Sequence, residues 1–207
     1  TEIMRSLFGL DPKDRGEVFI DDKKVEISKP IDAINNKIAF VTENRQEEGL
    51  VLDESIRENI SLLNFNHFTS KSFIDKKKER DLSNSLVDSF KVKTQSSESK
   101  VRDLSGGNQQ KVVFAKWYAI DPEILILDEP TKGVDVGAKR EIYDLIKQLT
   151  HKGVSVILIS SDLPELLSLS DRIYVIHEEK VNGELLREEA DQEKIMTLAT
   201  GGKPVSY

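Results

Sequence analysis

Apolar positions follow two spacings along this chain, and each spacing predicts one kind of element. Apolar residues that recur every three or four positions predict helices at residues 3–8, 82–90, 142–149 and 195–198. Short uninterrupted apolar runs predict buried strands at residues 38–41, 124–127 and 154–159. Strands that are apolar throughout are typical of a parallel sheet that is covered on both faces. The pattern therefore predicts an α/β fold.

Polar residues at turns and helix starts predict a hairpin and a helical lobe. Asp21 and Asp22 separate two short strands at 17–20 and 24–27, which indicates a hairpin. Ser55 and Glu58 have the spacing of a capping box and predict the start of a helix. We assign residues 55–104, which are rich in polar residues between apolar helix faces, to a helical lobe.

The stretch from Leu104 to Lys111 reads as a flexible turn that runs into a helix. Ser105, Gly106 and Gly107 open this helix, so unpaired backbone N–H groups and the positive end of the helix dipole point the same way. Such a helix end binds anions, and phosphate above all. The sequence therefore predicts a phosphate-binding turn here.

Two acidic residues follow the apolar run at 124–127. Asp128 and Glu129 would lie at the carboxyl end of a buried parallel strand, which is the edge where open α/β sheets bind ligands. A carboxylate there can hold Mg²⁺, and a second one can orient or deprotonate an attacking water. Each feature alone is ordinary in loops and strand ends, but together with the phosphate-binding turn they favour phosphoryl transfer.

The order of these motifs resembles that of the ATP-binding cassette (ABC) ATPases. Residues 104–110 resemble the signature loop, residues 124–130 the Walker B strand and residues 133–137 the D-loop. Two stretches resemble more narrowly the carboxyl-terminal cassette of monosaccharide importers of the ribose, xylose and galactose type. They are residues 108–111, at the end of the first motif, and residues 131–139. The resemblance covers essentially the whole chain. It implies a P-loop NTPase-like cassette with a mostly parallel core sheet, a small antiparallel β subdomain and a helical subdomain at 55–104, within one nucleotide-binding domain at 1–207.

The resemblance also implies the site residues. Asp128 and Glu129 would be catalytic, and Thr1 and Asp128 would hold Mg²⁺. The expected contacts to ATP are Thr1, Glu43, Ser105, Gly106, Gly107, Asn108, Gln109, Asp135 and Ser161. Two of these depart from the family pattern: Glu43 stands where most cassettes carry glutamine, and Ser161 stands where most carry the switch histidine. Thr1 falls on the hydroxyl residue that closes the P-loop, and the glycines and basic residue that would precede it are missing from this 207-residue sequence. Because those groups hold the β- and γ-phosphates, we expect negligible ATP hydrolysis by this chain alone.

Composition narrows the class of protein further. A hydrophobic content of 38% suits a globular domain, and no run approaches the roughly 18 apolar residues of a membrane span. Cysteine is absent and no secretory signal is visible, so we expect a cytoplasmic protein. A net charge of −7 disfavours a nucleic-acid partner. The resemblance implies a peripheral position on the inner face of the cell membrane, beside integral-membrane permease subunits.

The function implied is that of a second cassette that powers import of a monosaccharide or related small solute and lends its signature loop to a partner cassette. That partner would lie on the same polypeptide or in a dimer, and a solute-binding protein would act indirectly. Ser161 keeps open a non-catalytic, regulatory ABC half, and a nucleoside importer ATPase also fits the motifs. A non-transport ABC ATPase of DNA repair or translation is disfavoured, because neither coiled-coil insertions nor a basic surface is visible.

Overall fold

Three parallel strands form the sheet at the centre of the first part of the chain. Their order is β3 (Ile38–Val41), β6 (Ile124–Asp128) and β7 (Ser155–Ile159). The computed structural model describes residues 1–70 and 73–202 and separates into two compact units, Thr1–Ile159 and Ser160–Tyr207. The prediction of a single domain over 1–207 stays a prediction, and each unit is described by itself.

The central strand β6 pairs on both edges and is buried from Leu125 to Asp128. Ile126 and Leu127 have no exposed surface, and β3 beside them is buried along its whole length. The edge strand β7 is different: Ile157 is 37% exposed, and among the described residues no strand pairs with its outer edge. The prediction that residues 154–159 form a buried strand is therefore right in position and wrong in burial, since burial depends on the neighbour.

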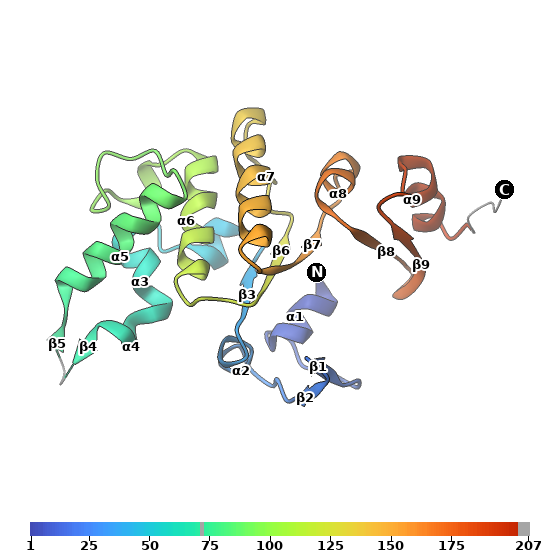
Figure 1. Ribbon diagram of the computed structural model, residues 1–207, viewed down its shortest axis with the longest axis horizontal. Helices are drawn as coiled ribbons and strands as arrows, with labels where there is room; N and C mark the ends of the chain where they lie inside the picture. The colour runs from blue at the N-terminus through green and yellow to red at the C-terminus, as the bar shows by residue number, and fades with distance from the viewer. Residues whose placement is uncertain (71–72, 203–207) are drawn as a thin grey trace. The chain divides into compact units, whose positions relative to one another are not determined.

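Helices pack against this sheet in the first unit (Figure 1). They are α1 (Glu2–Phe8), α2 (Pro30–Asn35), α6 (Gly106–Tyr118) and α7 (Val136–His151). The ring of Phe8 lies 5.4 Å from that of Phe40 and 5.6 Å from that of Trp117, so one aromatic cluster joins α1, β3 and α6. Gly9 ends α1 in the left-handed conformation, as helix ends commonly do.

A small hairpin follows α1, as predicted. Strands β1 (Val18–Ile20) and β2 (Lys23–Val25) are antiparallel, and the turn residues Asp21 and Asp22 both have positive φ. Two left-handed residues in a two-residue turn match the right-handed twist of the paired strands.

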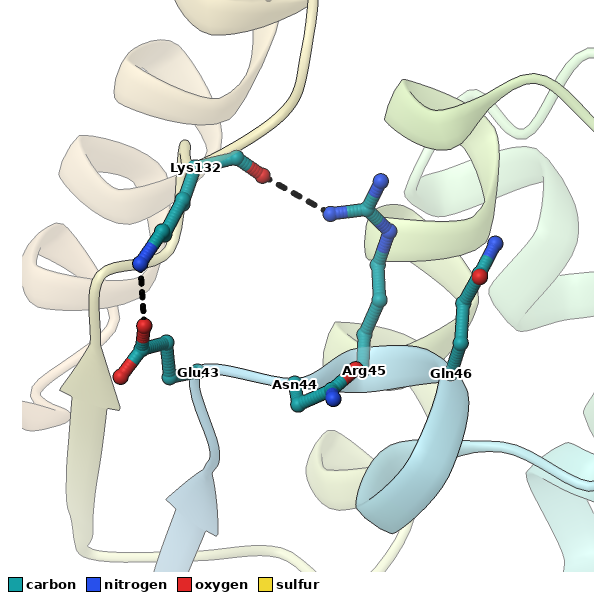
Figure 2. Close-up of a pocket in the computed structure, with 5 residues that line it drawn as sticks. All are labelled: Glu43, Asn44, Arg45, Gln46 and Lys132. Atoms are coloured by element: carbon teal, nitrogen blue, oxygen red, sulfur yellow. Dashed lines mark hydrogen bonds and ion pairs between the residues drawn. The ribbon is translucent and has the colours of Figure 1, made fainter.

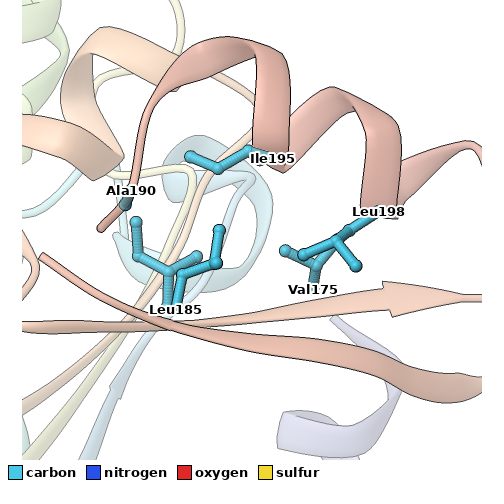
Figure 3. Packing of buried hydrophobic residues seen from close by; sticks show 6 residues of the cluster. Val175, Leu185, Ala190, Ile195 and Leu198 are labelled. Atoms are coloured by element: carbon cyan, nitrogen blue, oxygen red, sulfur yellow. The ribbon is translucent and has the colours of Figure 1, made fainter. Parts of the chain in front are cut away.

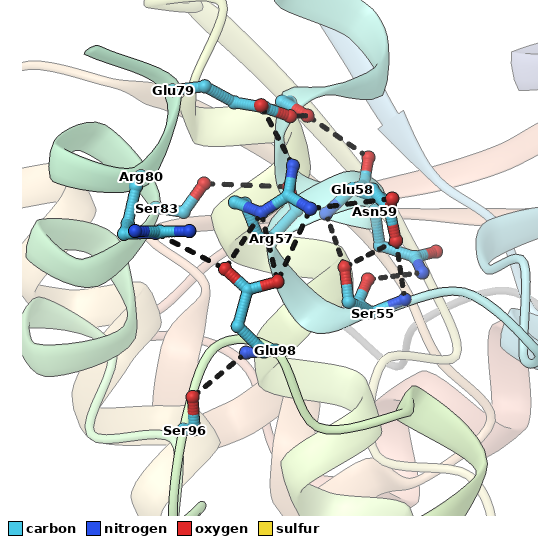
Figure 4. Close-up of polar contacts among 10 residues, drawn as sticks. Ser55, Arg57, Glu58, Asn59, Glu79, Arg80, Ser83, Ser96 and Glu98 are labelled. Atoms are coloured by element: carbon cyan, nitrogen blue, oxygen red, sulfur yellow. Dashed lines mark hydrogen bonds and ion pairs between the residues drawn. The ribbon is translucent and has the colours of Figure 1, made fainter. Parts of the chain in front are cut away.

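The helical part lies between β3 and α6. It contains α3 (Ile56–Ser61), the 3₁₀ turn η2 (Leu62–Asn64), α4 (Phe65–Phe68), β4 (Thr69–Ser70), β5 (Phe73–Ile74), α5 (Lys76–Ser89) and the 3₁₀ turn η3 (Val101–Asp103). The capping box is present, since Ser55 Oγ accepts from the Glu58 amide and Glu58 accepts from the Ser55 amide. Arg57 forms ion pairs with Glu79 and Glu98 (Figure 4). These ion pairs connect α3 to α5 and to the loop between α5 and η3.

The second unit has its own small core. It consists of α8 (Leu163–Leu169), the antiparallel pair β8 (Arg172–His177) and β9 (Lys180–Leu186), and α9 (Gln192–Ala199). Buried residues of the two strands, of α9 and of the connection between β9 and α9 pack together (Figure 3); they are Ile173, Val175, Leu185, Ala190, Ile195 and Leu198. Asp191 caps α9, since its side chain accepts a hydrogen bond from the Lys194 amide.

Candidate functional site

Asp128 ends β6 at the carboxyl edge of the sheet and is fully buried. The Thr1 hydroxyl donates a hydrogen bond of 3.1 Å to Asp128 Oδ1, which brings together two residues that are 127 positions apart in the sequence. Asp128 Oδ2 is also buried and has no hydrogen-bond partner among the described residues. Burial raises the pKa of Asp128, and the hydrogen bond from Thr1 opposes that shift.

A buried carboxylate oxygen without a donor fits a cation as its missing partner. Mg²⁺ takes oxygen ligands and is commonly held by one or two protein groups together with substrate phosphates. In the described part of the chain, no set of three acidic or histidine side chains could hold a metal by itself. The hydroxyl of Thr1 and the open oxygen of Asp128 therefore fit Mg²⁺ in the presence of a nucleotide.

Glu129 follows Asp128 in an unusual backbone conformation. Its φ is 47°, in the left-handed region that residues other than glycine rarely adopt. Two backbone hydrogen bonds hold it there: the Glu129 amide donates to the Ile159 carbonyl at 2.9 Å, and the Glu129 carbonyl accepts from the Lys132 amide at 3.0 Å. We call residues 128–133 the acid turn. Strained backbone of this kind costs about 1–3 kcal/mol and is found disproportionately at functional sites.

Glu43 lies on the loop after β3, beside the acid turn. Its carboxylate pairs with the Lys132 ammonium, and this hydrogen bond raises the pKa of Lys132. Glu43 and Lys132 line a polar pocket of about 340 Å³ together with Asn44, Arg45 and Gln46 (Figure 2). The sequence reasoning missed Arg45 and Lys132 as site residues, although the adjacent parallel strands β3 and β6 must bring the loops that carry them to one edge.

The predicted phosphate-binding turn begins α6. We call residues 105–109 the signature turn. Ser105 is exposed and accepts a hydrogen bond of 2.9 Å from the Asn108 side chain, so its own oxygen does not cap the helix. Gly107 is buried where α6 meets Ala138 of α7. The position needs glycine, because a Cβ there would collide with the alanine methyl.

Gln109 is almost fully buried at the end of this turn. Its side chain accepts from Gln46 at 3.0 Å and donates to the Val101 carbonyl at 3.2 Å. Gln109 thus joins three segments of the first unit, while its role as a contact to ATP stays a prediction.

Two predicted contacts to ATP remain, Asp135 and Ser161. Asp135 is exposed and caps α7 by accepting from the Ala138 amide at 2.9 Å. Ser161 belongs to the second unit and is exposed there. The structure thus brings Thr1, Glu43, Asp128 and Glu129 to one edge of the sheet, and the roles of Asp135 and Ser161 stay predictions.

The sheet edge thus carries three carboxylates and a hydroxyl, and comparison with known protein families identifies the class of protein. The family described as ABC transporter matches residues 1–132, so the chain belongs to the ABC transporter family. The prediction of an ABC transporter ATPase domain is confirmed. None of the helices in the described residues is long and apolar enough to cross a membrane.

Curated relatives and solved structures refine this assignment. The chain is 58% identical over 203 residues to the ribose import ATP-binding protein RbsA of Bacillus licheniformis and 56% identical over 203 residues to that of Bacillus subtilis. Each match covers 98% of this chain and 41% of the relative, so the chain spans about two fifths of their length. The resemblance to monosaccharide importer cassettes is thereby confirmed.

The fold has solved counterparts at low identity. A dimeric ATP-binding cassette in a post-hydrolysis state bound to ADP and phosphate superposes with a TM-score of 0.74 at 23% identity, covering 90% of this chain and 79% of that one. A nucleotide-free cassette from an ABC transporter gives a TM-score of 0.78 at 20% identity, covering 96% and 79%. These similarities confirm the predicted fold class.

Proposed function

We propose that this chain binds and hydrolyses ATP within an importer for ribose or a related monosaccharide. Identity of 58% and 56% to ribose import ATP-binding proteins supports this class of solute. The observation that carries the ATPase role is the pairing of Thr1 with a buried Asp128 that keeps one oxygen open. A hydroxyl and a carboxylate so placed suit a nucleotide-bound cation.

The proposal gives a role to each of five residues at the sheet edge. Thr1 and Asp128 hold Mg²⁺, which when bound neutralises charge on the phosphates. Glu129 accepts the proton of the attacking water, and its two backbone hydrogen bonds hold its backbone at the sheet edge. Lys132 pairs with Glu43, so that one of the surrounding carboxylates is neutralised.

The signature turn serves a second nucleotide. We infer that the free N–H groups at the start of α6 contact a phosphate presented by a partner cassette, on the same polypeptide or in a dimer, with the exposed Ser105 beside it. The chain then acts as a second cassette whose own site is weakened by Glu43 and Ser161. Permease subunits would be its direct membrane partners on the inner face, and a solute-binding protein would act through them.

The test is made in the longer, two-cassette protein proposed here. Gly106→Asp puts a negative charge and a side chain where backbone must approach phosphate, so it should abolish most ATP hydrolysis and ribose uptake while ATP binding persists. Ser161→Ala should cost little by comparison, because no histidine is lost. ATPase rate, nucleotide binding and uptake of labelled ribose are measured for both variants beside the parent protein.

Each outcome separates the candidates. Near-normal turnover in Gly106→Asp would contradict the role in trans, and a collapse in Ser161→Ala would assign catalysis to the chain's own site. Uptake of a nucleoside in place of ribose would favour the alternative importer. A parent protein that binds ATP without hydrolysing it would favour a regulatory half, for which the absence of the switch histidine at Ser161 is the supporting feature.

A further inference from the structure

Arg45 lies between the two motifs that the proposed function uses. Its Nη1 donates to the Lys132 carbonyl at 2.9 Å and its Nη2 lies 3.4 Å from the Gly133 carbonyl, so its guanidinium caps the end of the acid turn. The same Nη2 lies 2.7 Å from the point that a Cβ on Gly106 would occupy. One side chain thus touches the end of the acid turn and the first residue of α6.

The segment that carries Arg45 is anchored along α6. Arg45–Gly49 forms a π-helical turn, η1, and we call residues 43–49 the bridging loop. Gln46 contacts Gln109, a Cβ on Gly49 would lie 3.2 Å from the side chain of Val113, and the buried Lys116 ammonium donates to the Gly49 carbonyl at 2.9 Å. These α6 residues follow one another at helical spacing, so one face of α6 holds the bridging loop.

A continuous series of hydrogen bonds leads from this loop to the catalytic acid. The Glu129 carbonyl accepts from the Lys132 amide, and the Lys132 carbonyl accepts from Arg45. Figure 2 shows Arg45 pointing from the bridging loop to the carbonyl of Lys132. Since each link is a direct contact, a shift of the bridging loop along α6 would move the turn that holds Glu129.

The Arg45 guanidinium binds backbone carbonyls and not a carboxylate. Among the residues that the structure describes, Arg45 forms no ion pair with a carboxylate; its guanidinium donates to two backbone carbonyls, and its Nε is buried without a partner. Burial lowers its pKa. The guanidinium of this half-buried arginine donates to two successive carbonyls and so fixes the position of the backbone, because its planar fork matches that geometry.

We propose that Arg45 is a positioning residue that couples the acid turn to the signature turn within one chain. The proposal rests on the proposed function for its effect on turnover. Its structural part, that both turns loosen together when Arg45 is lost, holds whether or not the chain hydrolyses ATP. Arg45 would then link the acid that serves the chain's own nucleotide to the turn that the chain lends to its partner.

The first experiment measures amide hydrogen exchange in the longer protein, without nucleotide. Arg45→Gln should raise exchange about tenfold or more at Lys132 and Val134 in the acid-turn segment and at Gln109 in the signature turn, the effect of losing one hydrogen bond to a charged donor. Arg140→Gln, which changes an exposed arginine on α7, is the matched control and should leave both segments unchanged. Unchanged exchange in Arg45→Gln, or a rise in only one segment, would overturn the coupling.

The second experiment is a double-mutant cycle on ATP turnover. Gly106→Ala places a methyl group against Arg45 Nη2, so it should slow turnover about tenfold in the parent and clearly less in the Arg45→Gln background, where that atom is gone. Strictly additive losses would overturn the proposal. If the parent protein does not turn over ATP, the proposed function fails, while the exchange measurement still decides the role of Arg45.

Discussion

Replacing Asp128 by asparagine should stabilise the fold. Asp128 has no exposed surface, and its Oδ2 has no donor among the described residues, so the ionised carboxylate is buried with only the Thr1 hydroxyl as a hydrogen-bond partner. Asparagine has the same shape and keeps an oxygen that can accept from Thr1. The substitution therefore removes the charge and leaves the packing in place.

The size of the effect follows from the cost of a buried polar group without its partner. That cost is about 1–3 kcal/mol, and more for a charged group. For a domain of this size, 1 kcal/mol moves the unfolding midpoint by about 2–4 °C, so we expect Asp128→Asn to raise it by roughly 2–12 °C near pH 7.

The difference between the two proteins should depend on pH with a definite sign. Burial raises the pKa of Asp128 in the folded state, so the folded protein binds a proton more readily than the unfolded chain does. Stability from this group is then fully present below the unfolded pKa and is lost as pH rises through the folded pKa. The advantage of Asp128→Asn should be small in acid and reach its full size at neutral pH.

Thermal unfolding of the 207-residue chain in EDTA, followed by circular dichroism across this pH range, measures the effect. Asp135→Asn is the control: Asp135 is exposed and asparagine caps a helix as well as aspartate does, so its midpoint should not move. An Asp128→Asn protein that is no more stable than the parent at neutral pH, or an advantage that grows toward acid, would refute the reasoning.

Two further substitutions address Glu129, the proposed general base, and the ion pair between α6 and α7. Glu129→Gln in the longer protein should slow turnover at this chain's own site by about 10²- to 10⁴-fold with ATP binding retained, and a single-turnover assay that finds no loss would show that this site is silent. Glu141→Gln should destabilise the fold by about 1–2 kcal/mol at neutral pH, because it takes the ion-pair partner from the buried Lys111. The hydrogen bond from Lys111 lowers the pKa of Glu141, so the stabilisation by this pair is present at neutral pH and is lost as pH falls through that lowered pKa. Urea unfolding of Glu141→Gln and the parent at neutral and acid pH measures this, and a loss of stability that does not shrink in acid would contradict it.

Local chemistry made much of the fold predictable. The Asp21–Asp22 turn and the Ser55–Glu58 capping box depend on residues that are neighbours in sequence, and both appear as expected. The acids at the carboxyl end of β6 were predictable for a related reason, since the apolar run sets the strand and the edge follows from parallel pairing.

Contacts between distant side chains were not predictable in the same way. Thr1 and Asp128 are 127 positions apart, and their approach depends on how α1 and β6 pack. The π-helical turn at Arg45–Gly49 has no sequence signature, because it is stabilised by its contacts with α6. The partial exposure of β7 likewise depends on which strands lie beside it, and the apolar run alone cannot report that.

The acid turn places an uncompensated charge next to a strained residue, and this pairing has a geometric reason. Successive side chains of a strand point to opposite faces, so an extended Glu129 would point away from the face that Asp128 uses. The left-handed conformation of Glu129 breaks that alternation and ends the strand there, while its amide and carbonyl are both satisfied by hydrogen bonds. The strain therefore costs no backbone hydrogen bond, and two carboxylates reach one edge of the sheet. Burial of Asp128 without a donor by itself costs stability, whereas the cation of the proposed site would supply the partner that its open oxygen lacks.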